Sequence, residues 1–187
     1  MKGGSRMETA WYFKLLVPNI GLMIVSFLLF LIIKAKRMTG PGPGKRMQLV
    51  STGYTVIGFI LTWFISYSID TAFWIGLTII IFGEIIFASG YMAMREHPEK
   101  KQAVVDWGIY KVSRNSHVLA GQIGFLGVVI MGWRPGSVLY IVLWVYYILS
   151  IVLMHSGVVS EEKSNIERFG QEYVDYTKRV PRYFGKL

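Results

Sequence analysis

Polar side chains able to bind a charged ligand occur in two short stretches, one before and one after a long apolar region. The first stretch is 114–117 (Arg-Asn-Ser-His), and the second comprises His155 and 160–162 (Ser-Glu-Glu). Free backbone N–H groups at the start of a helix attract an anion such as a ligand carboxylate. The paired glutamates suit an ammonium group and sugar hydroxyls. The chain has no cysteine, which excludes a thiolate metal site and a cysteine nucleophile, and we expect no bound metal.

Two apolar runs, 118–133 and 137–154, connect these polar stretches. Arg134-Pro135-Gly136 stands between the runs, and proline and glycine interrupt a helix. We therefore predict a tight helical hairpin. Because its two helices have similar lengths, the polar stretches at its open end are expected to be neighbours in space.

The composition predicts that this hairpin belongs to a membrane protein. Of the 187 residues, 53% are hydrophobic and 17% are charged, whereas soluble domains carry about 25% charged residues. A membrane-spanning helix needs roughly 20 apolar residues. We predict an all-α integral membrane protein with a single membrane domain over residues 1–187 and about five transmembrane helices. The expected spans are 14–34, 49–69, 72–94, 117–133 and 136–155, followed by an amphipathic cytoplasmic tail helix over 160–180.

The net charge of +9 is distributed unevenly among the loops. Basic residues gather in 34–46, in 95–114 and in the tail, whereas the intervening loops hold only Asp70 and Arg134. Basic loops favour the cytoplasmic side, so the C-terminus is predicted in the cytoplasm and the N-terminus outside. We expect membrane lipids, through their anionic headgroups, as the partners of this charge and expect no nucleic acid.

Two segments carry a family resemblance. The first is Gly108-Ile-Tyr-Lys-Val-Ser-Arg-Asn-Ser116, which resembles the G-x-Y-x-x-x-R-[HN]-P motif of the isoprenylcysteine carboxyl methyltransferase and phospholipid methyltransferase superfamily. The second runs from Glu161 to Arg182 and is similar to that superfamily's E-E, F-G-x-x-Y-x-x-Y and V-P-R signature. The two motifs occur in the expected order and flank the helical hairpin.

The resemblance implies S-adenosylmethionine-dependent methyl transfer to a lipid or another lipid-soluble acceptor at the cytoplasmic membrane face. By this resemblance, the residues that bind the cofactor are Tyr110, Arg114, Asn115, Ser116, His117, Leu119, Glu161 and Glu162. We predict His155 and Glu162 as catalytic residues. Tyr173 and Tyr176 are expected to pack within the tail rather than to contact substrate.

The chain also departs from the pattern. Ser116 stands in place of a proline, Gly185 in place of the final proline, and Gly157 in place of an arginine before the glutamates. In the family that arginine is a candidate for orienting the acceptor. We therefore expect either that the acceptor differs or that His155 or Arg182 takes the place of the missing arginine. Carboxylate, amine and thiol acceptors remain open.

Other interpretations of these residues remain. Ser160 resembles an N-cap, in which case the two glutamates would only complement the dipole of the tail helix. Glu84 lies near the middle of a predicted span, where it either hydrogen-bonds within the bundle or lines a cavity or proton path. The alternative function is a non-catalytic small transporter or sensor with the same scaffold. Gly76, Gly83 and Gly90 recur every seven residues and favour close helix packing.

Overall fold

The computed structural model describes residues 45–65, 67–96 and 104–185, and this part of the chain is helical without strands. Its elements are α3 (Lys45–Phe64), α4 (Thr71–Glu96), the 3-10 turn η3 (Gly108–Lys111), α5 (Ser116–Met131), α6 (Val138–Phe169) and α7 (Gln171–Arg179). The prediction of an all-α protein is confirmed for these residues. The predicted first span, 14–34, lies outside them.

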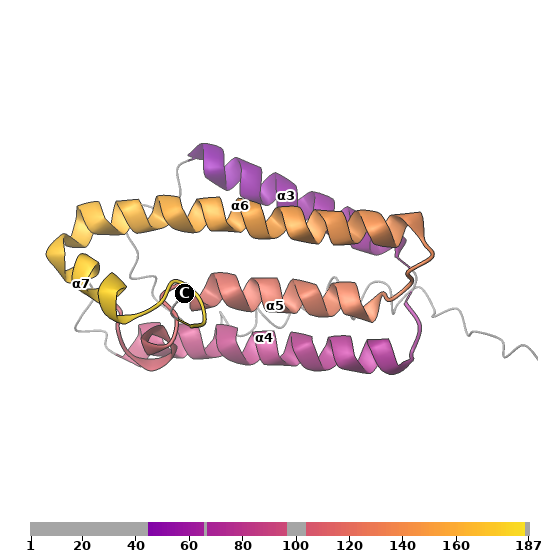
Figure 1. The fold of residues 1–187 in the computed structure, drawn as a ribbon, viewed down its shortest axis with the longest axis horizontal. Coiled ribbons are helices and arrows are strands. Elements are labelled where there is room, and N and C mark those ends of the chain that lie inside the picture. Colours follow the sequence, from indigo (N-terminus) through magenta and orange to yellow (C-terminus); the bar gives the residue numbers. More distant parts are fainter. Residues whose placement is uncertain (1–44, 66, 97–103, 186–187) are drawn as a thin grey trace, which may run out of the picture.

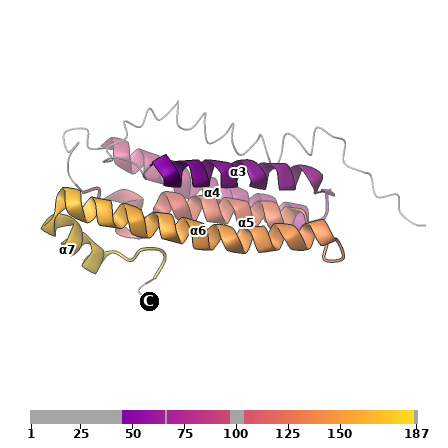
Figure 2. The same ribbon diagram turned by 90° about the horizontal axis from the view of Figure 1, so that it is seen from above.

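The long helices α4, α5 and α6 lie side by side, and each runs opposite to the one before (Figure 1). A tight turn joins α5 to α6, in which the Ser137 amide donates to the carbonyl oxygen of Arg134 at 3.0 Å. The predicted hairpin is therefore present. The end of α4, the start of α5, the end of α6 and all of α7 share one end of the bundle (Figures 1 and 2), which we call the polar end.

Glycine brings the backbones of α4 and α5 into direct contact. A Cβ atom on Gly127 would lie 2.6 Å from the carbonyl oxygen of Gly76 and 2.7 Å from Cγ1 of Ile80. A Cβ atom on Gly83 would lie 3.0 Å from the carbonyl oxygen of Ala120. A side chain does not fit at Gly127, and one at Gly83 would be tighter than ordinary contact, so the close packing predicted for Gly76 and Gly83 is confirmed. A Cβ atom on Gly90, the third glycine of this spacing, would make only ordinary contacts.

Helix α6 contacts α3 through a reciprocal tyrosine pair. The rings of Tyr54 and Tyr146 stack with their centroids 4.1 Å apart. Each hydroxyl donates a hydrogen bond to the backbone carbonyl oxygen of the other residue. Gly58 permits this approach, because a Cβ atom there would lie 3.0 Å from the Tyr146 ring. Each tyrosine hydroxyl therefore has its hydrogen-bond acceptor on the neighbouring helix.

The outer faces of α4 and α6 are apolar. Segments Thr71–Met94 and Val138–Phe169 are long and apolar enough to cross a membrane, yet only 28% and 22% of their most apolar windows are buried within the protein. The exposed side chains include Ile81, Phe82, Ile85, Val145, Ile148, Leu149 and Val152. Outward-facing apolar surface of this kind is stable against lipid rather than against water. The general prediction of a helical protein with membrane-crossing helices is therefore supported.

One predicted boundary is wrong. The tail helix predicted over 160–180 does not begin at 160. Helix α6, which has 32 residues in all, continues past His155 to Phe169, so Ser160 lies inside it and is not the N-cap of a separate tail helix. The interruption comes at Gly170, whose φ of 57° is in the left-handed region that favours glycine. The change from apolar to charged residues after Met154 marks a change of environment and not a helix end.

The glycine contact makes a prediction about stability. Gly127→Ala should lower the free energy of unfolding by about 1–3 kcal/mol, because the added methyl group overpacks the α4–α5 interface. The matched control is Gly121→Ala in the same helix, where a Cβ atom would meet nothing within 4 Å. That control should be neutral or stabilising by about 0.5–1 kcal/mol. Unfolding of the purified protein in detergent measures both, and equal effects would contradict the packing argument.

Candidate functional site

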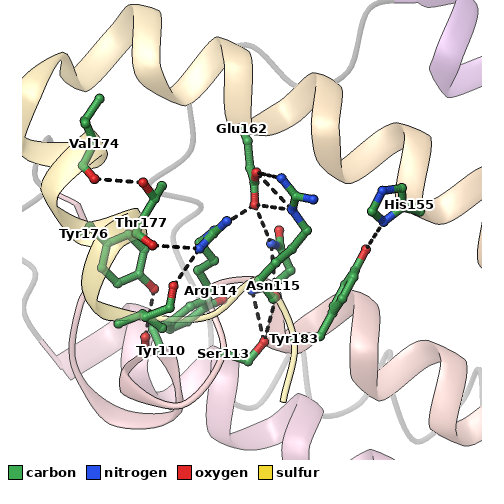
Figure 3. Close-up of polar contacts among 12 residues, drawn as sticks. Tyr110, Ser113, Arg114, Asn115, His155, Glu162, Val174, Tyr176, Thr177 and Tyr183 are labelled. Carbon is green, nitrogen blue, oxygen red and sulfur yellow. Dashed lines mark hydrogen bonds and ion pairs between the residues drawn. The ribbon is translucent and has the colours of Figure 1, made fainter. Parts of the chain in front are cut away.

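A buried carboxylate organises the polar end. Glu162 on α6 is 6% exposed. Its Oε1 accepts a hydrogen bond from Nε of Arg114 at 2.8 Å and from Nδ2 of Asn115 at 3.2 Å (Figure 3). Arg182 donates to both carboxylate oxygens, and its Nη2 lies 2.7 Å from Oε2. We call these four residues the Glu162 cluster.

The C-terminal segment wraps around Arg114. Nη1 of Arg114 donates to the carbonyl oxygens of Thr177 at 3.2 Å and Val180 at 2.6 Å. The Arg114 amide donates to the carbonyl oxygen of Pro181 at 3.2 Å. The carbonyl oxygen of Arg182 accepts from the Ser113 hydroxyl and from the Asn115 side chain. The residues before α5 thus satisfy backbone carbonyls in the last turn of α7 and in the segment after it.

The aromatic residues of the tail pack against the segment before α5. Val104, Tyr173, Tyr176 and Val180 form one buried apolar cluster. The Tyr176 hydroxyl donates to the carbonyl oxygen of Tyr110 at 2.8 Å, and burial raises the pKa of Tyr176. The two tail tyrosines are therefore packed side chains, as the sequence indicated. Their packing holds α7 against η3.

On the side facing α4, two buried hydroxyls lie beside Gly90. A Cβ atom on Gly90 would be 3.5 Å from Oγ of Ser116 and 3.7 Å from the Tyr110 hydroxyl. Ser116 Oγ is buried, and its polar neighbour is the Tyr110 hydroxyl. Burial raises the pKa of Tyr110 to about 12, the interaction with the Ser116 side chain lowers it, and the negative charge of Glu161 adds a smaller increase. Two adjacent buried hydroxyls are candidate contacts for a polar ligand.

On the opposite side, a pocket of about 540 Å³ lies between α6, α7 and the C-terminal segment. We call it the tail pocket. It is lined by Arg114, His155, Thr177, Lys178, Val180, Pro181, Arg182, Tyr183, Phe184 and Gly185. Nδ1 of His155 lies 3.2 Å from the Tyr183 hydroxyl (Figure 3). The volume is within the range of pockets that bind small molecules.

The predicted site residues fall into distinct groups. Arg114, Asn115 and Glu162 are in direct contact, as the hairpin geometry predicted. His155 does not join them but lies in the tail pocket beside Tyr183. The remaining predicted residues are Tyr110 and Ser116, which are buried, and His117, Leu119 and Glu161, which are half-buried.

Two residues contribute more than the sequence indicates. Arg182 ends the second motif and is a candidate replacement for the missing arginine, and in the structure it forms the second ion pair of Glu162. The V-P-R ending of the tail motif was the available signal. Tyr183 was not singled out, and no pattern in the sequence indicates its contact with His155. Among the described residues, no group of three His, Asp or Glu side chains could hold a metal ion.

The Glu162 cluster makes a prediction about stability. Glu162→Gln should lower the free energy of unfolding by about 3–5 kcal/mol, because removing one partner leaves buried charge uncompensated. The matched control, Glu167→Gln, changes an exposed carboxylate on the same helix and should have little effect. Thermal unfolding compares the variants, and limited proteolysis shows whether the C-terminal segment is released. A Glu162→Gln protein as stable as the control would contradict the assigned role.

The comparisons with known proteins identify a family. No curated protein and no solved structure matches the chain. A family model described as "Protein of unknown function (DUF1295)" matches residues 7–180, and no methyltransferase family matches. Because this match covers most of the sequence, the chain belongs to the DUF1295 family.

Proposed function

We propose that the protein is an integral membrane enzyme that transfers a methyl group from S-adenosylmethionine to a lipid or another lipid-soluble acceptor. One observation carries the proposal. Arg114 and Asn115 of the first motif contact Glu162 of the second motif inside the protein. Two methyltransferase-like motifs that are distant in the sequence therefore form one polar cluster, as a shared cofactor site would require. We likewise propose that the family is related to the membrane methyltransferase superfamily.

The residues facing α4 suit the cofactor chemically. S-adenosylmethionine supplies a methyl group on a sulfonium and carries hydroxyls, an ammonium and a carboxylate. The neighbouring Ser116 and Tyr110 hydroxyls would bind polar groups, and Glu161 would attract the ammonium. We propose that His117 and Leu119 also border this cofactor site, because they lie in the first turn of α5. A dry and shaped site that orients the reactants contributes most to such a transfer.

We assign different tasks to the two predicted catalytic residues. His155 borders the tail pocket directly after the apolar part of α6, so it can orient a lipid-soluble acceptor or accept its proton. Glu162 is engaged by Arg114, Asn115 and Arg182. We therefore propose that Glu162 acts as a positioning residue that holds Arg114 and Asn115 in place.

The proposed membrane arrangement has about five spans, with the N-terminus outside and the polar end in the cytoplasm. Support comes from the two long apolar helices and the shorter apolar α5. Exposed basic residues at the polar end, among them Lys111, Lys163 and Lys178, agree with this orientation. Membrane lipids are then the natural partners of the apolar faces and the basic end.

A specific observation also favours a second candidate, a non-catalytic transporter or sensor. Both oxygens of Glu162 are occupied by side chains of the protein itself, and the C-terminal segment covers Arg114. A cluster closed in this way would serve as a structural clamp and would not require a ligand. Binding of the cofactor distinguishes the two candidates.

The orientation can be tested by cysteine labelling, since the chain has no cysteine of its own. We expect Gly136→Cys in the α5–α6 turn to react with a membrane-impermeant thiol reagent in intact cells. Lys163→Cys at the polar end should react only after the membrane is permeabilised. Both positions are exposed. The reverse pattern would contradict the proposed orientation.

Cofactor binding can be tested by calorimetric titration of the detergent-purified protein with S-adenosylhomocysteine. We expect binding, and we expect Glu161→Gln to weaken it about tenfold or more, because a hydrogen bond to a charged group is lost. Glu167→Gln, on the exposed part of the same helix, should bind like the parent protein. Glu161 is a better test than Glu162, because Glu162 also stabilises the fold.

Two outcomes would contradict the methyltransferase proposal. One is the absence of S-adenosylhomocysteine binding, provided that an unfolding measurement in detergent shows that the protein is folded. The other is equal affinity in the Glu161→Gln and Glu167→Gln variants. The first would favour the non-catalytic candidate.

A further inference from the structure

The tail pocket has an unbalanced charge. Arg114, Lys178 and Arg182 line it together with His155, and no Asp or Glu does. The two arginines share the single carboxylate of Glu162, so one positive charge remains uncompensated within the cluster. Opposite charge is the simplest complement to such a pocket.

Lys178 adds a second positive charge at the rim. Its Nζ lies 2.8 Å from Oδ1 of Asp175, but both side chains are largely exposed, at 66% and 54%. Exposed ion pairs of this kind are weak. Lys178 can therefore turn to an anion in the pocket at small cost. Asp175 itself is not among the lining residues.

The pocket also has apolar walls at the depth where the apolar part of α6 ends. His155 directly follows the charge-free run that ends at Met154. Val180 and Pro181 line the pocket, and Phe184 beside them is 46% exposed. A soluble anion would gain nothing from these apolar surfaces, because it has no apolar part to bury against them. An amphiphile would place its charge among the basic groups and its apolar part along Phe184 toward the bilayer.

We propose that the tail pocket binds the headgroup of an anionic phospholipid, with phosphate oxygens near Lys178, Arg182 and the His155–Tyr183 pair. Guanidinium and ammonium groups form strong charge-assisted hydrogen bonds to phosphate. The bilayer itself supplies this ligand at high local concentration. The inference goes beyond methyl transfer and holds whether or not the protein binds S-adenosylmethionine.

The test uses the full-length protein in a neutral detergent, with no methyl donor present. Dioctanoylphosphatidylglycerol is titrated calorimetrically below its micelle-forming concentration, with dioctanoylphosphatidylcholine as the zwitterionic comparison. We expect the anionic lipid to bind more tightly. Lys178→Gln should weaken binding of the anionic lipid about fivefold, since each basic residue near an anionic headgroup contributes a binding free energy that corresponds to about this factor.

Arg179→Gln is the matched control. Arg179 is the next residue of α7, its side chain is 65% exposed, and it pairs at the surface with Asp106 rather than lining the pocket. It should bind the lipid like the parent protein. Because both substitutions remove one exposed positive charge, comparing them separates a defined site from general surface attraction. Thermal unfolding of both variants checks that they are folded.

Three results would overturn the proposal. They are equal binding of the two lipids, equal weakening by Lys178→Gln and Arg179→Gln, and complete displacement of the lipid by millimolar inorganic phosphate. The last would show that the pocket takes a soluble anion and does not select a membrane lipid.

Discussion

The neutralisation of Glu162 is the interaction on which the polar end depends. A carboxylate that leaves water without partners is very costly, so burial of Glu162 demands positive charge from neighbouring segments. Arg114 supplies it from the residue before Asn115 and α5, and Arg182 supplies it from the segment after α7. One side chain of α6 therefore fixes two stretches of chain that have no regular structure of their own. The tail pocket exists because the segment from Thr177 to Gly185 is held there.

The helices make this arrangement possible because the end of α4, the start of α5 and the end of α6 lie together at the polar end. Direct backbone contact at Gly76 and Gly127 fixes α5 against α4. The short turn after α5 then returns the chain as α6, and Tyr146 connects it to α3. Glu162 lies about two turns beyond the apolar part of α6, where it contacts Arg114 and Asn115 just before α5. Because α6 continues as a helix through Ser160, it positions Glu161 and Glu162 at the site.

Features governed by local composition could be predicted from the sequence. Apolar runs identified α4, α5 and α6, and the Arg134-Pro135-Gly136 break identified the hairpin. The similar lengths of its two apolar runs predicted that Arg114 would meet Glu162, although the helices themselves have 16 and 32 residues. Glycine spacing predicted close packing of α4 but not which helix it contacts. The continuation of α6 was missed because charged residues continue a helix as readily as apolar ones, and only Gly170 interrupts it. The Tyr54–Tyr146 pair and the His155–Tyr183 contact depend on side chains from distant segments, and neither has a sequence pattern.

The Glu162 cluster also separates two surfaces of different chemistry. Facing α4 are the buried hydroxyls of Ser116 and Tyr110 near Glu161, where positive or hydroxyl-bearing groups are favoured. Facing the tail are basic and apolar side chains around His155, where a negative amphiphile is favoured. Residues 114–116 contribute to both, since the Arg114 side chain borders the pocket while Ser116 faces Gly90. A polar cofactor from the cytosol and a lipid headgroup from the bilayer would therefore bind on opposite sides of the same cluster. Methyl transfer needs the reacting atoms about 3–3.5 Å apart, so an acceptor in the tail pocket would have to reach past the cluster to the sulfonium methyl.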